Sequence, residues 1–94
     1  MSRVREIVRS TQFKRDFKKI SASGRYSVSD FLEVVNLLAH DIPLPQKNRD
    51  HALTGEWKGF RECHIKPDWL LIYEKPQGQL ILVLARTGSH SELF

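Results

Sequence analysis

Histidine side chains gather in the second half of the chain, among arginines, carboxylates and aromatic rings. His51, His64 and His90 are three of the four histidines, and each lies near a predicted turn or strand end. An imidazole exchanges a proton near neutral pH. Arginine neutralises a phosphate group, and an aromatic ring stacks on a base. Together, these side chains supply the groups that RNA cleavage without a metal ion requires.

The chemistry that these groups suit is transesterification at a phosphodiester. The ribose 2′-hydroxyl is already held beside the scissile phosphorus, so the RNA brings its own nucleophile. The protein has to remove one proton, stabilise charge on the phosphoryl oxygens and protonate the departing 5′-oxygen. Histidine or a carboxylate suits the two proton transfers. Arginine or lysine suits the stabilisation of charge.

Each of the other candidate residues has a structural and a functional interpretation. Arg61 and Arg86 either form surface ion pairs with glutamates, which contribute little to stability, or bind phosphate. Trp69 opens an apolar strand, where a core position is the default. Phe94 follows a polar stretch, and it is expected to stack on a base or to pack against the domain. His40 is expected at a helix C-terminus, where it complements the helix dipole.

Two other chemistries would use the same region of the sequence. The side chains of His51, His64, Asp68 and His90 are of the metal-ligand type, but their spacing matches no compact ligand motif. We therefore expect no metal and no other cofactor. Cys63 as a nucleophile is disfavoured, because it and His64 are neighbours in a strand and point to opposite faces.

Composition and charge narrow the class of protein. The chain has 94 residues, a net charge of +4 and 40% hydrophobic residues, which predicts one globular domain over residues 1–94. An excess of basic over acidic residues favours a nucleic-acid partner only modestly. The single cysteine excludes an internal disulfide, and neither a signal peptide nor a membrane span is read. These features predict a cytoplasmic protein without a membrane partner.

The first part of the chain predicts a strand and two helices. Residues 5–9 suit a short strand, and the next helix begins at Ser10 or the residue after it and ends near Gly24. The second helix begins at Ser27, which has capping-box spacing with Asp30. Val34 and Leu37 are expected to lie outside the buried stripe of this helix. That stripe is predicted to contain Phe31, Leu32, Val35, Leu38 and Ala39.

The second part predicts three strands, at residues 60–65, 69–75 and 80–86, joined by two turns. The last two strands are apolar on both faces, which indicates central positions covered by helix on at least one side. The order of elements is therefore β-α-α-β-β-β. This order is typical of an α+β fold.

Two segments carry a resemblance to a known family. Residues 50–73, DHALTGEWKGFRECHIKPDWLLIY, and residues 86–94, RTGSHSELF, closely resemble the YafQ branch of the RelE/ParE superfamily of bacterial type II toxins. Over the two helices, only the general pattern matches. The resemblance implies a small antiparallel sheet with two helices packed on it. It also implies an mRNA interferase that cuts translated messages in the ribosomal A site.

The resemblance also implies roles in proton transfer. By position, His51 and His64 share the proton transfers, and Asp68 orients or assists them. His90 is the acid or a phosphate ligand. Glu62 falls on a position implicated in close relatives. Which histidine is the base and which is the acid stays open.

For contacts with RNA, the resemblance implies that Arg86 holds the scissile phosphate. Trp69 and Phe94 position bases, and Arg61 is a further phosphate-binding candidate. Basic residues of the first helix are candidates for contact with the ribosome. They are Lys14, Arg15, Lys18 and Lys19.

The family implies protein and RNA partners. A cognate antitoxin would cover the toxin with an acidic segment, which the +4 charge complements; Val34 and Leu37 would be available to it. The other partners would be the ribosome and mRNA. Two alternatives remain: a ParE-like inhibitor of a protein such as gyrase, and a degenerate toxin that only binds its antitoxin. The histidine set speaks against the inhibitor, which has no need of clustered proton-transfer groups.

Overall fold

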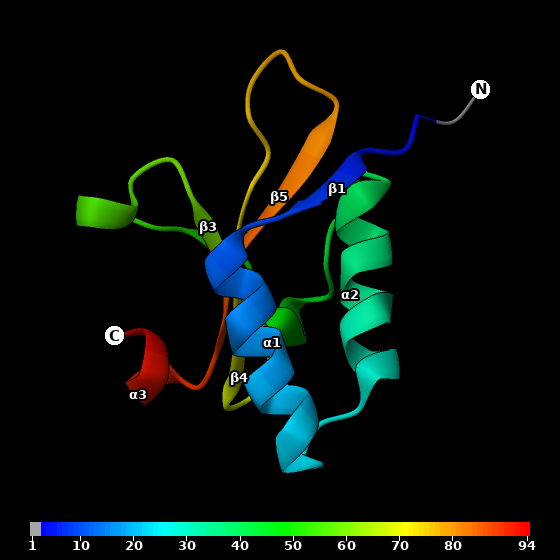
Figure 1. The fold of residues 1–94 in the computed structure, drawn as a ribbon. Coiled ribbons are helices and arrows are strands. Elements are labelled where there is room, and N and C mark those ends of the chain that lie inside the picture. Colours follow the sequence, from blue (N-terminus) through cyan, green and yellow to red (C-terminus); the bar gives the residue numbers. More distant parts are fainter. Residues whose placement is uncertain (1–2) are drawn as a thin grey trace.

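One five-stranded sheet carries two helices on the same face (Figure 1). The computed structural model describes residues 3–94. Residues 1–2, which belong to the segment where no signal peptide was read, lie outside this range. The strands are arranged in the order β1-β5-β4-β3-β2. The predicted α+β fold is confirmed, and so are the interior positions of the last two predicted strands.

The α-helices and strands follow one another as predicted, with two additions, and two 3₁₀ helices lie at Gln46–Asn48 and Gly55–Trp57. The predicted elements are β1 (Glu6–Arg9), α1 (Thr11–Ser23), α2 (Val28–Ala39), β3 (Arg61–Lys66), β4 (Trp69–Glu74) and β5 (Ile81–Gly88). The additions are β2 (His51–Ala52) and α3 (His90–Leu93). Both additions are too short for hydrophobic periodicity to reveal. Each carries a candidate histidine.

The sheet is mixed rather than wholly antiparallel. β1 pairs with β5 in parallel, in a register that runs from Glu6 opposite Ile81 to Arg9 opposite Leu84. The pairs β2–β3, β3–β4 and β4–β5 are antiparallel. Turn residues indicate the direction of consecutive strands. They carry no information on how two strands from opposite ends of the chain pair.

The ends of α1 follow the predicted capping chemistry. The Ser10 hydroxyl accepts a hydrogen bond from the Phe13 amide at 2.9 Å, and Gly24 takes the left-handed conformation with φ 67°. Helix α2 begins after Ser27 as predicted but has no side-chain cap. The predicted capping box is absent there, because the Ser27 hydroxyl is 2.6 Å from that of Ser29 instead.

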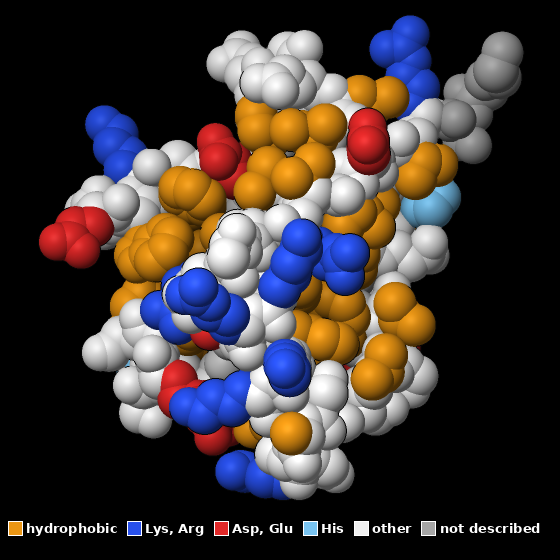
Figure 2. Space-filling model, viewed as in Figure 1, with side chains coloured by type: hydrophobic (Ala, Val, Ile, Leu, Met, Phe, Trp, Pro, Cys, Tyr) orange, Lys and Arg blue, Asp and Glu red, His pale blue; other side chains and the backbone are white. Residues whose placement is uncertain are grey.

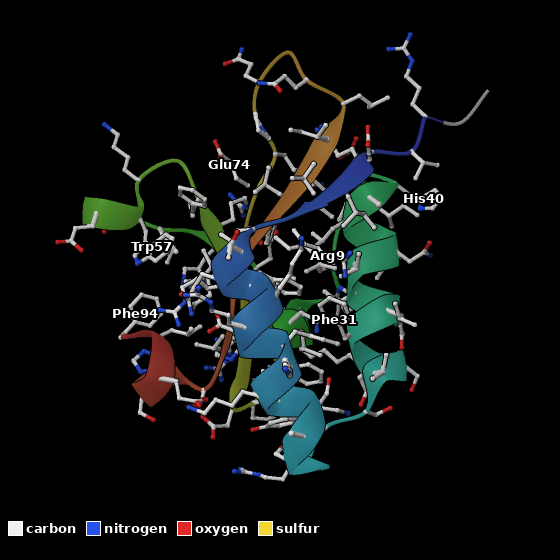
Figure 3. All side chains as sticks on the ribbon, in the orientation of Figure 1. Arg9, Phe31, His40, Trp57, Glu74 and Phe94 are labelled. Atoms are coloured by element: carbon white, nitrogen blue, oxygen red, sulfur yellow. The ribbon has the colours of Figure 1, made fainter. Side chains whose placement is uncertain are left out.

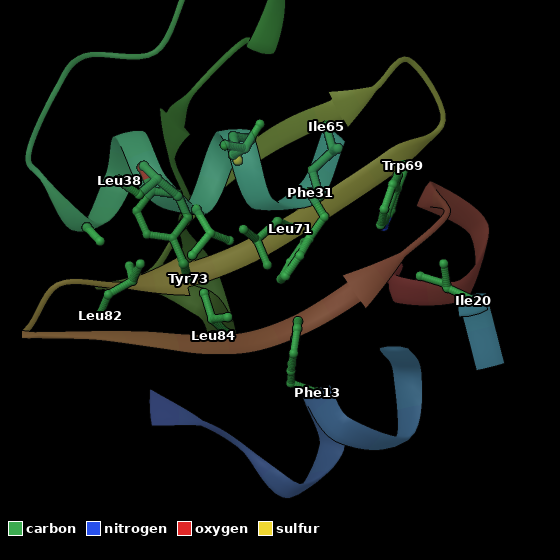
Figure 4. Packing of buried hydrophobic residues seen from close by; sticks show 14 residues of the cluster. Phe13, Ile20, Phe31, Leu38, Ile65, Trp69, Leu71, Tyr73, Leu82 and Leu84 are labelled. Carbon is green, nitrogen blue, oxygen red and sulfur yellow. The ribbon is translucent and has the colours of Figure 1, made fainter. Parts of the chain in front are cut away.

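The buried face of α2 differs from the prediction at two positions. Val34 is buried at 5% exposure, whereas Leu32 is 56% exposed. The helical stripe that starts at Phe31 continues at i+3, i+4 and i+7, so it includes Val34 and excludes Leu32. The corrected stripe packs against the sheet in the larger of the two hydrophobic clusters (Figure 4).

The opposite face of the sheet carries a smaller apolar cluster, formed by Leu70, Ile72, Ala85 and Leu93. Leu93 belongs to α3, so this single helical turn is held against the sheet by one buried side chain. Because no long helix crosses this face, it leaves room for polar side chains between the apolar ones.

Among the described residues, no helix is long and apolar enough to cross a membrane.

Candidate active site

Side chains from four strands form one row across the face opposite the helices. His51 on β2 is the register partner of Glu62 on β3. Glu62 pairs with Ile72 on β4, and Ile72 pairs with Arg86 on β5. Residues directly opposite one another project from the same face of a sheet. With neighbouring strands about 4.8 Å apart, the backbones of Glu62 and Arg86 are roughly 10 Å apart.

His64 adds a second histidine beside this row. It lies two residues after Glu62 on β3 and therefore points to the same face. The Nε2 atom of His64 is 3.8 Å from Glu62 Oε1, and the Nε2 atom of His51 is 3.6 Å from the same oxygen. Only 6% of the Glu62 side chain is exposed, against 50% for His51 and 18% for His64. A buried carboxylate oxygen thus lies between two imidazoles.

Backbone carbonyls select the tautomer of both rings. His51 Nδ1 is 2.8 Å from the Arg49 carbonyl oxygen, and His64 Nδ1 is 3.2 Å from that of Pro67. A carbonyl only accepts, so Nδ1 carries the hydrogen in both rings. The Nε2 atom of a neutral ring then holds the lone pair. When Nε2 takes up a proton, the imidazolium forms an ion pair with Glu62.

The carboxylate between the two histidines is therefore Glu62, and the assisting role that the resemblance implied for Asp68 stays a prediction. Asp68 is exposed in the turn between β3 and β4. Its side chain lines a cavity between α1 and α3, together with Lys19 and Tyr26. Among the described residues, no hydrogen bond or ion pair joins the Asp68 side chain to either histidine of the row. The structure separates the two carboxylates that the sequence had grouped.

Arg86 is held by a carboxylate of α1. Its Nε and Nη2 atoms each donate to Asp16 at 3.0 Å, and the Thr87 amide donates to the same carboxylate at 3.2 Å. The hydrogen bond with Asp16 raises the pKa of Arg86. Burial raises the pKa of Asp16, but hydrogen bonds from Arg86, Gln12 and Thr87 outweigh this effect and leave it below 3.8. The pair is charged at neutral pH, and its bidentate geometry fixes the guanidinium.

Helix α3 presents His90 and Phe94 to solvent. A reciprocal capping box joins Ser89 to Glu92, and the Ser89 amide donates to Glu92 Oε1 at 2.8 Å. The rings of His90 and Phe94 are 5.2 Å apart. Phe94 is 54% exposed, because Leu93 provides the buried anchor. Figure 3 shows Phe94 on the side of the molecule away from α2. The sequence left base stacking and packing open for Phe94, and its ring is accessible for stacking.

Trp69 is a core residue, the default that its place in an apolar strand had given, and the role in positioning bases that the resemblance implied stays a prediction. Its side chain is 1% exposed, and its ring packs 4.7 Å from that of Tyr26. The indole Nε1 donates to the Thr87 hydroxyl at 2.9 Å, and this hydroxyl donates to the Leu70 carbonyl at 2.7 Å. Trp69 thereby supports β5 next to Arg86.

Arg61 lies outside the row as well. It precedes Glu62 and points to the helix-covered face, where Nε and Nη2 each lie 3.3 Å from the Asp50 carboxylate. Arg61 therefore forms an ion pair, as the structural alternative proposed, but with Asp50 rather than with a glutamate. The expected phosphate contact of Arg61 is thereby separated from the histidines.

The remaining candidates divide by exposure. Lys14 and Lys18 are exposed on α1, where Lys and Arg side chains gather over the helix (Figure 2). His40 ends α2, and its Nδ1 is 2.8 Å from the Asn36 carbonyl. Burial raises the pKa of the Cys63 thiol, which stays protonated and is no nucleophile. Within residues 3–94, no group of three or more His, Cys, Asp or Glu side chains is placed to hold a metal ion.

Fold and site define a small α+β protein whose open sheet face carries histidines, a glutamate and an arginine, the side-chain types expected in a compact nuclease. The model of a protein family described as the YafQ toxin, a bacterial toxin of type II toxin–antitoxin systems, matches residues 5–94. The chain therefore belongs to the YafQ family of type II toxins. The resemblance read from its sequence is confirmed.

Known relatives cover nearly the whole chain. It is 36% identical over 91 residues to the mRNA interferase toxin YafQ of Escherichia coli K12, with 96% of each chain covered. A copper-bound mutant toxin from Helicobacter pylori has a TM-score of 0.89 at 43% identity, covering 96% of this chain and 99% of the other. A chain of the E. coli DinJ–YafQ complex has a TM-score of 0.82 at 36% identity, covering 96% and 98%. The predicted enzyme class, an endoribonuclease, is confirmed through these relatives.

Proposed function

We propose that this toxin is a ribosome-dependent endoribonuclease that cuts translated mRNA in the ribosomal A site. A single toxin domain, residues 1–94, would attack the scissile phosphate through the ribose 2′-hydroxyl, without a metal ion. The observation that supports this most is the row that places His51, Glu62 and Arg86 on one face, with His64 beside it. It joins proton-transfer groups to a phosphate-binding arginine across one sheet.

The two histidines of the row divide the proton transfers. One imidazole takes the 2′-hydroxyl proton at its Nε2 atom, and Glu62 stabilises the imidazolium that forms. The other gives a proton to the 5′-oxygen, or His90 does so from α3. Arg86 binds the phosphoryl oxygens with the N–H groups that Asp16 leaves free. The two assignments of acid and base remain equivalent in this arrangement, because both Nε2 atoms lie at similar distances from one oxygen.

Recognition of the message would come from two exposed regions. Phe94 offers an accessible ring on which a base of the A-site codon stacks. Lys14 and Lys18 lie on the basic surface of α1, which suits contact with ribosomal RNA. The open position of His51 supports dependence on the ribosome, since a half-exposed site offers little to orient a free RNA strand.

A cognate antitoxin is the proposed protein partner, in the bacterial cytoplasm. A similar toxin has been crystallised as a DinJ–YafQ complex. Net charge +4 favours an acidic partner segment. Of the apolar residues of α2, Leu32 is available to such a partner, and the buried Val34 is not.

Primer extension on a defined mRNA tests the function. Purified protein is added with and without translating ribosomes, and with EDTA in a third reaction. We expect cuts at a fixed position in the reading frame, and only with ribosomes. In the third reaction, EDTA is added after the ribosomes have been loaded and crosslinked. Removal of Mg²⁺ at that stage should leave the cuts unchanged. His64→Ala should abolish the cuts.

Other outcomes would select the alternatives. Cuts on naked RNA would keep the nuclease and remove the A-site mechanism. Toxicity that survives His64→Ala and brings a DNA-damage response would indicate a ParE-like inhibitor. A protein that binds an antitoxin but is neither toxic nor active would be a degenerate toxin.

A further inference from the structure

A cavity of about 220 Å³ lies between α1 and the end of β5, next to Arg86. We propose that this cavity is a second phosphate site, in which Arg15 and Lys19 bind the backbone phosphate adjacent to the scissile one. The site rests on the proposed function, since it extends the RNA strand whose scissile phosphate Arg86 holds. Its ligand is a phosphodiester of single-stranded RNA.

The geometry of α1 separates its four basic residues into two pairs. Arg15 and Lys19 are four residues apart and share one helix face. Both line the cavity beside Arg86. Lys14 and Lys18 have the same spacing but lie on another face, and neither is among the residues that line this cavity. The sequence treated all four as equivalent, whereas the fold directs only one pair at the site.

The carboxylates in the cavity wall are already engaged. Asp16 accepts two hydrogen bonds from Arg86, one from the Thr87 amide and one from Gln12 at 3.0 Å. An ionised carboxylate has about four acceptor positions, so all of them are used. Its side chain is only 10% exposed. Asp16 therefore belongs to the wall as an anchor for Arg86 and does not compete for the ligand.

Glu92 is the other carboxylate, and its ion pair with Lys19 is easily exchanged. The Ser89 amide occupies Glu92 Oε1 at 2.8 Å, while Lys19 Nζ lies 3.4 Å from Oε2. The Lys19 side chain is 78% exposed and that of Glu92 is 43% exposed. Such exposed pairs contribute little. A phosphate can therefore replace Glu92 as the partner of Lys19.

Arg86 links this cavity to the histidine row. Its backbone belongs to the row, and its guanidinium is held in the cavity wall by Asp16. Two of the five N–H donors of an arginine are used by Asp16, which leaves three. A strand that crosses Arg86 from the row thus brings its next phosphate to Arg15 and Lys19. Three cations then face two consecutive phosphates.

The test compares two double variants with the same loss of charge. Arg15→Gln/Lys19→Gln removes the proposed ligands, and Arg3→Gln/Lys47→Gln, at two exposed cations outside α1, is the control with the same loss of charge. The substrate is a short synthetic mRNA, free or ribosome-bound, in whichever form the wild type cuts. Its phosphates near the cut are replaced one at a time by neutral methylphosphonates, and kcat and KM are measured.

We expect one adjacent methylphosphonate to raise KM on the order of tenfold for the wild type and the control, as for the loss of a charged hydrogen bond. The Arg15/Lys19 variant should start with the raised KM and should not respond to this replacement. A variant that responds like the wild type would overturn the second site. Equal losses of activity in both double variants would indicate a general attraction between the basic protein and RNA instead of a second phosphate site. Weakened binding of the antitoxin alone would assign the cavity to that partner instead.

Failure of this inference is distinguishable from failure of the proposed function. If the wild type cuts, His64→Ala does not, and the Arg15/Lys19 variant cuts normally, the nuclease stands and the second phosphate site falls. If the wild type cuts neither form of the message, the proposed nuclease function is wrong, and the second phosphate site, which rests on it, is wrong as well.

Discussion

Two charged neighbours on strand β3, Arg61 and Glu62, point to opposite faces of the sheet and make different contacts. Arg61 points to the other face of the sheet, where it and the Tyr73 hydroxyl both donate to Asp50, the hydroxyl at 2.5 Å. Burial is the largest cause that raises the pKa of Tyr73, and the hydrogen bond to Asp50 raises it further. Glu62 points to the face opposite the helices and lies between His51 and His64, whose side chains are partly exposed. One residue along β3 thus separates an arginine that is hydrogen-bonded to a carboxylate from two histidines whose Nε2 atoms lie 3.6 and 3.8 Å from another carboxylate.

The difference is one of pairing rather than of exposure, because the Arg61 side chain is 42% exposed, against 50% for His51 and 18% for His64. A polar group under α2 must be satisfied inside the protein, because leaving it unpaired costs about 1–3 kcal/mol. In the described part of the chain, no buried side-chain nitrogen or oxygen lacks a hydrogen-bond partner. On the open face, part of each histidine meets solvent instead. Those groups stay available for a substrate, and the predictions below test this contrast.

The largest effect is expected from His64→Ala on the open face. Loss of a group that transfers a proton should lower kcat by about 10²–10⁴-fold, with a small change in the thermal midpoint. His40→Ala is the matched control, because His40 is exposed and bonded only to its own helix. Cleavage rates and thermal melts of both variants check this. Equal activity in the two variants would contradict the proposed site.

The next effect concerns the ring of Phe94. Phe94→Ala should weaken substrate binding by about 1–3 kcal/mol, the range for one stacked base, and leave stability unchanged. Phe94→Leu keeps an apolar side chain but cannot stack, so it should lose nearly as much. The KM for mRNA of the two variants is the measurement. Recovery in Phe94→Leu would indicate simple packing rather than stacking.

On the covered face, Trp69→Phe should act through stability alone. It removes the hydrogen bond to Thr87 and part of a buried ring, which costs about 1–3 kcal/mol. Activity per folded molecule should remain near that of the wild type at a temperature well below the melt. Denaturant unfolding and cleavage assays separate the two effects. Loss of cleavage with unchanged stability would restore the direct contact with a base.

The smallest effect is a pH dependence from Asp16. Its pKa in the folded protein lies below its usual 3.8, so its stabilising contribution is complete above that pH and is lost as the pH falls through the folded value. Thermal midpoints below about pH 3.8 should therefore drop more steeply in the wild type than in Asp16→Asn. Asp30→Asn is the control, from a partly exposed ion pair with Lys66. Parallel curves for wild type and Asp16→Asn would exclude this contribution.

Local patterns predicted the elements well, and they failed where pairing is long-range. The apolar spacing of α1 and α2 and the turns around β4 sufficed for their position in the chain. The parallel pairing of β1 with β5 was missed, because it joins segments about 75 residues apart, as in Glu6 and Ile81. The short elements β2 and α3 were missed because neither has the length to show a period.

Candidate residues were found by type, while their grouping required the fold. Glu62 and Asp68 are both carboxylates near His64 in the sequence, and only strand pairing distinguishes the one that contacts both histidines. Trp69 and Phe94 are both large aromatics, and only burial separates the core residue from the accessible one. The contact of Asp16 with Arg86 spans 70 residues. No spacing rule connects a helix residue with a strand that distant.

The sequence by itself determined the family, the α+β class and the supply of proton-transfer and phosphate-binding groups, since these depend on residue type and local period. The tertiary structure alone decided which side chains share a face. Cross-strand register aligned His51, Glu62 and Arg86, an ion pair with Asp50 engaged Arg61, and helix packing buried Trp69. The physical reason is that alternation along a strand assigns a residue to one of two faces, but only packing determines which face is covered.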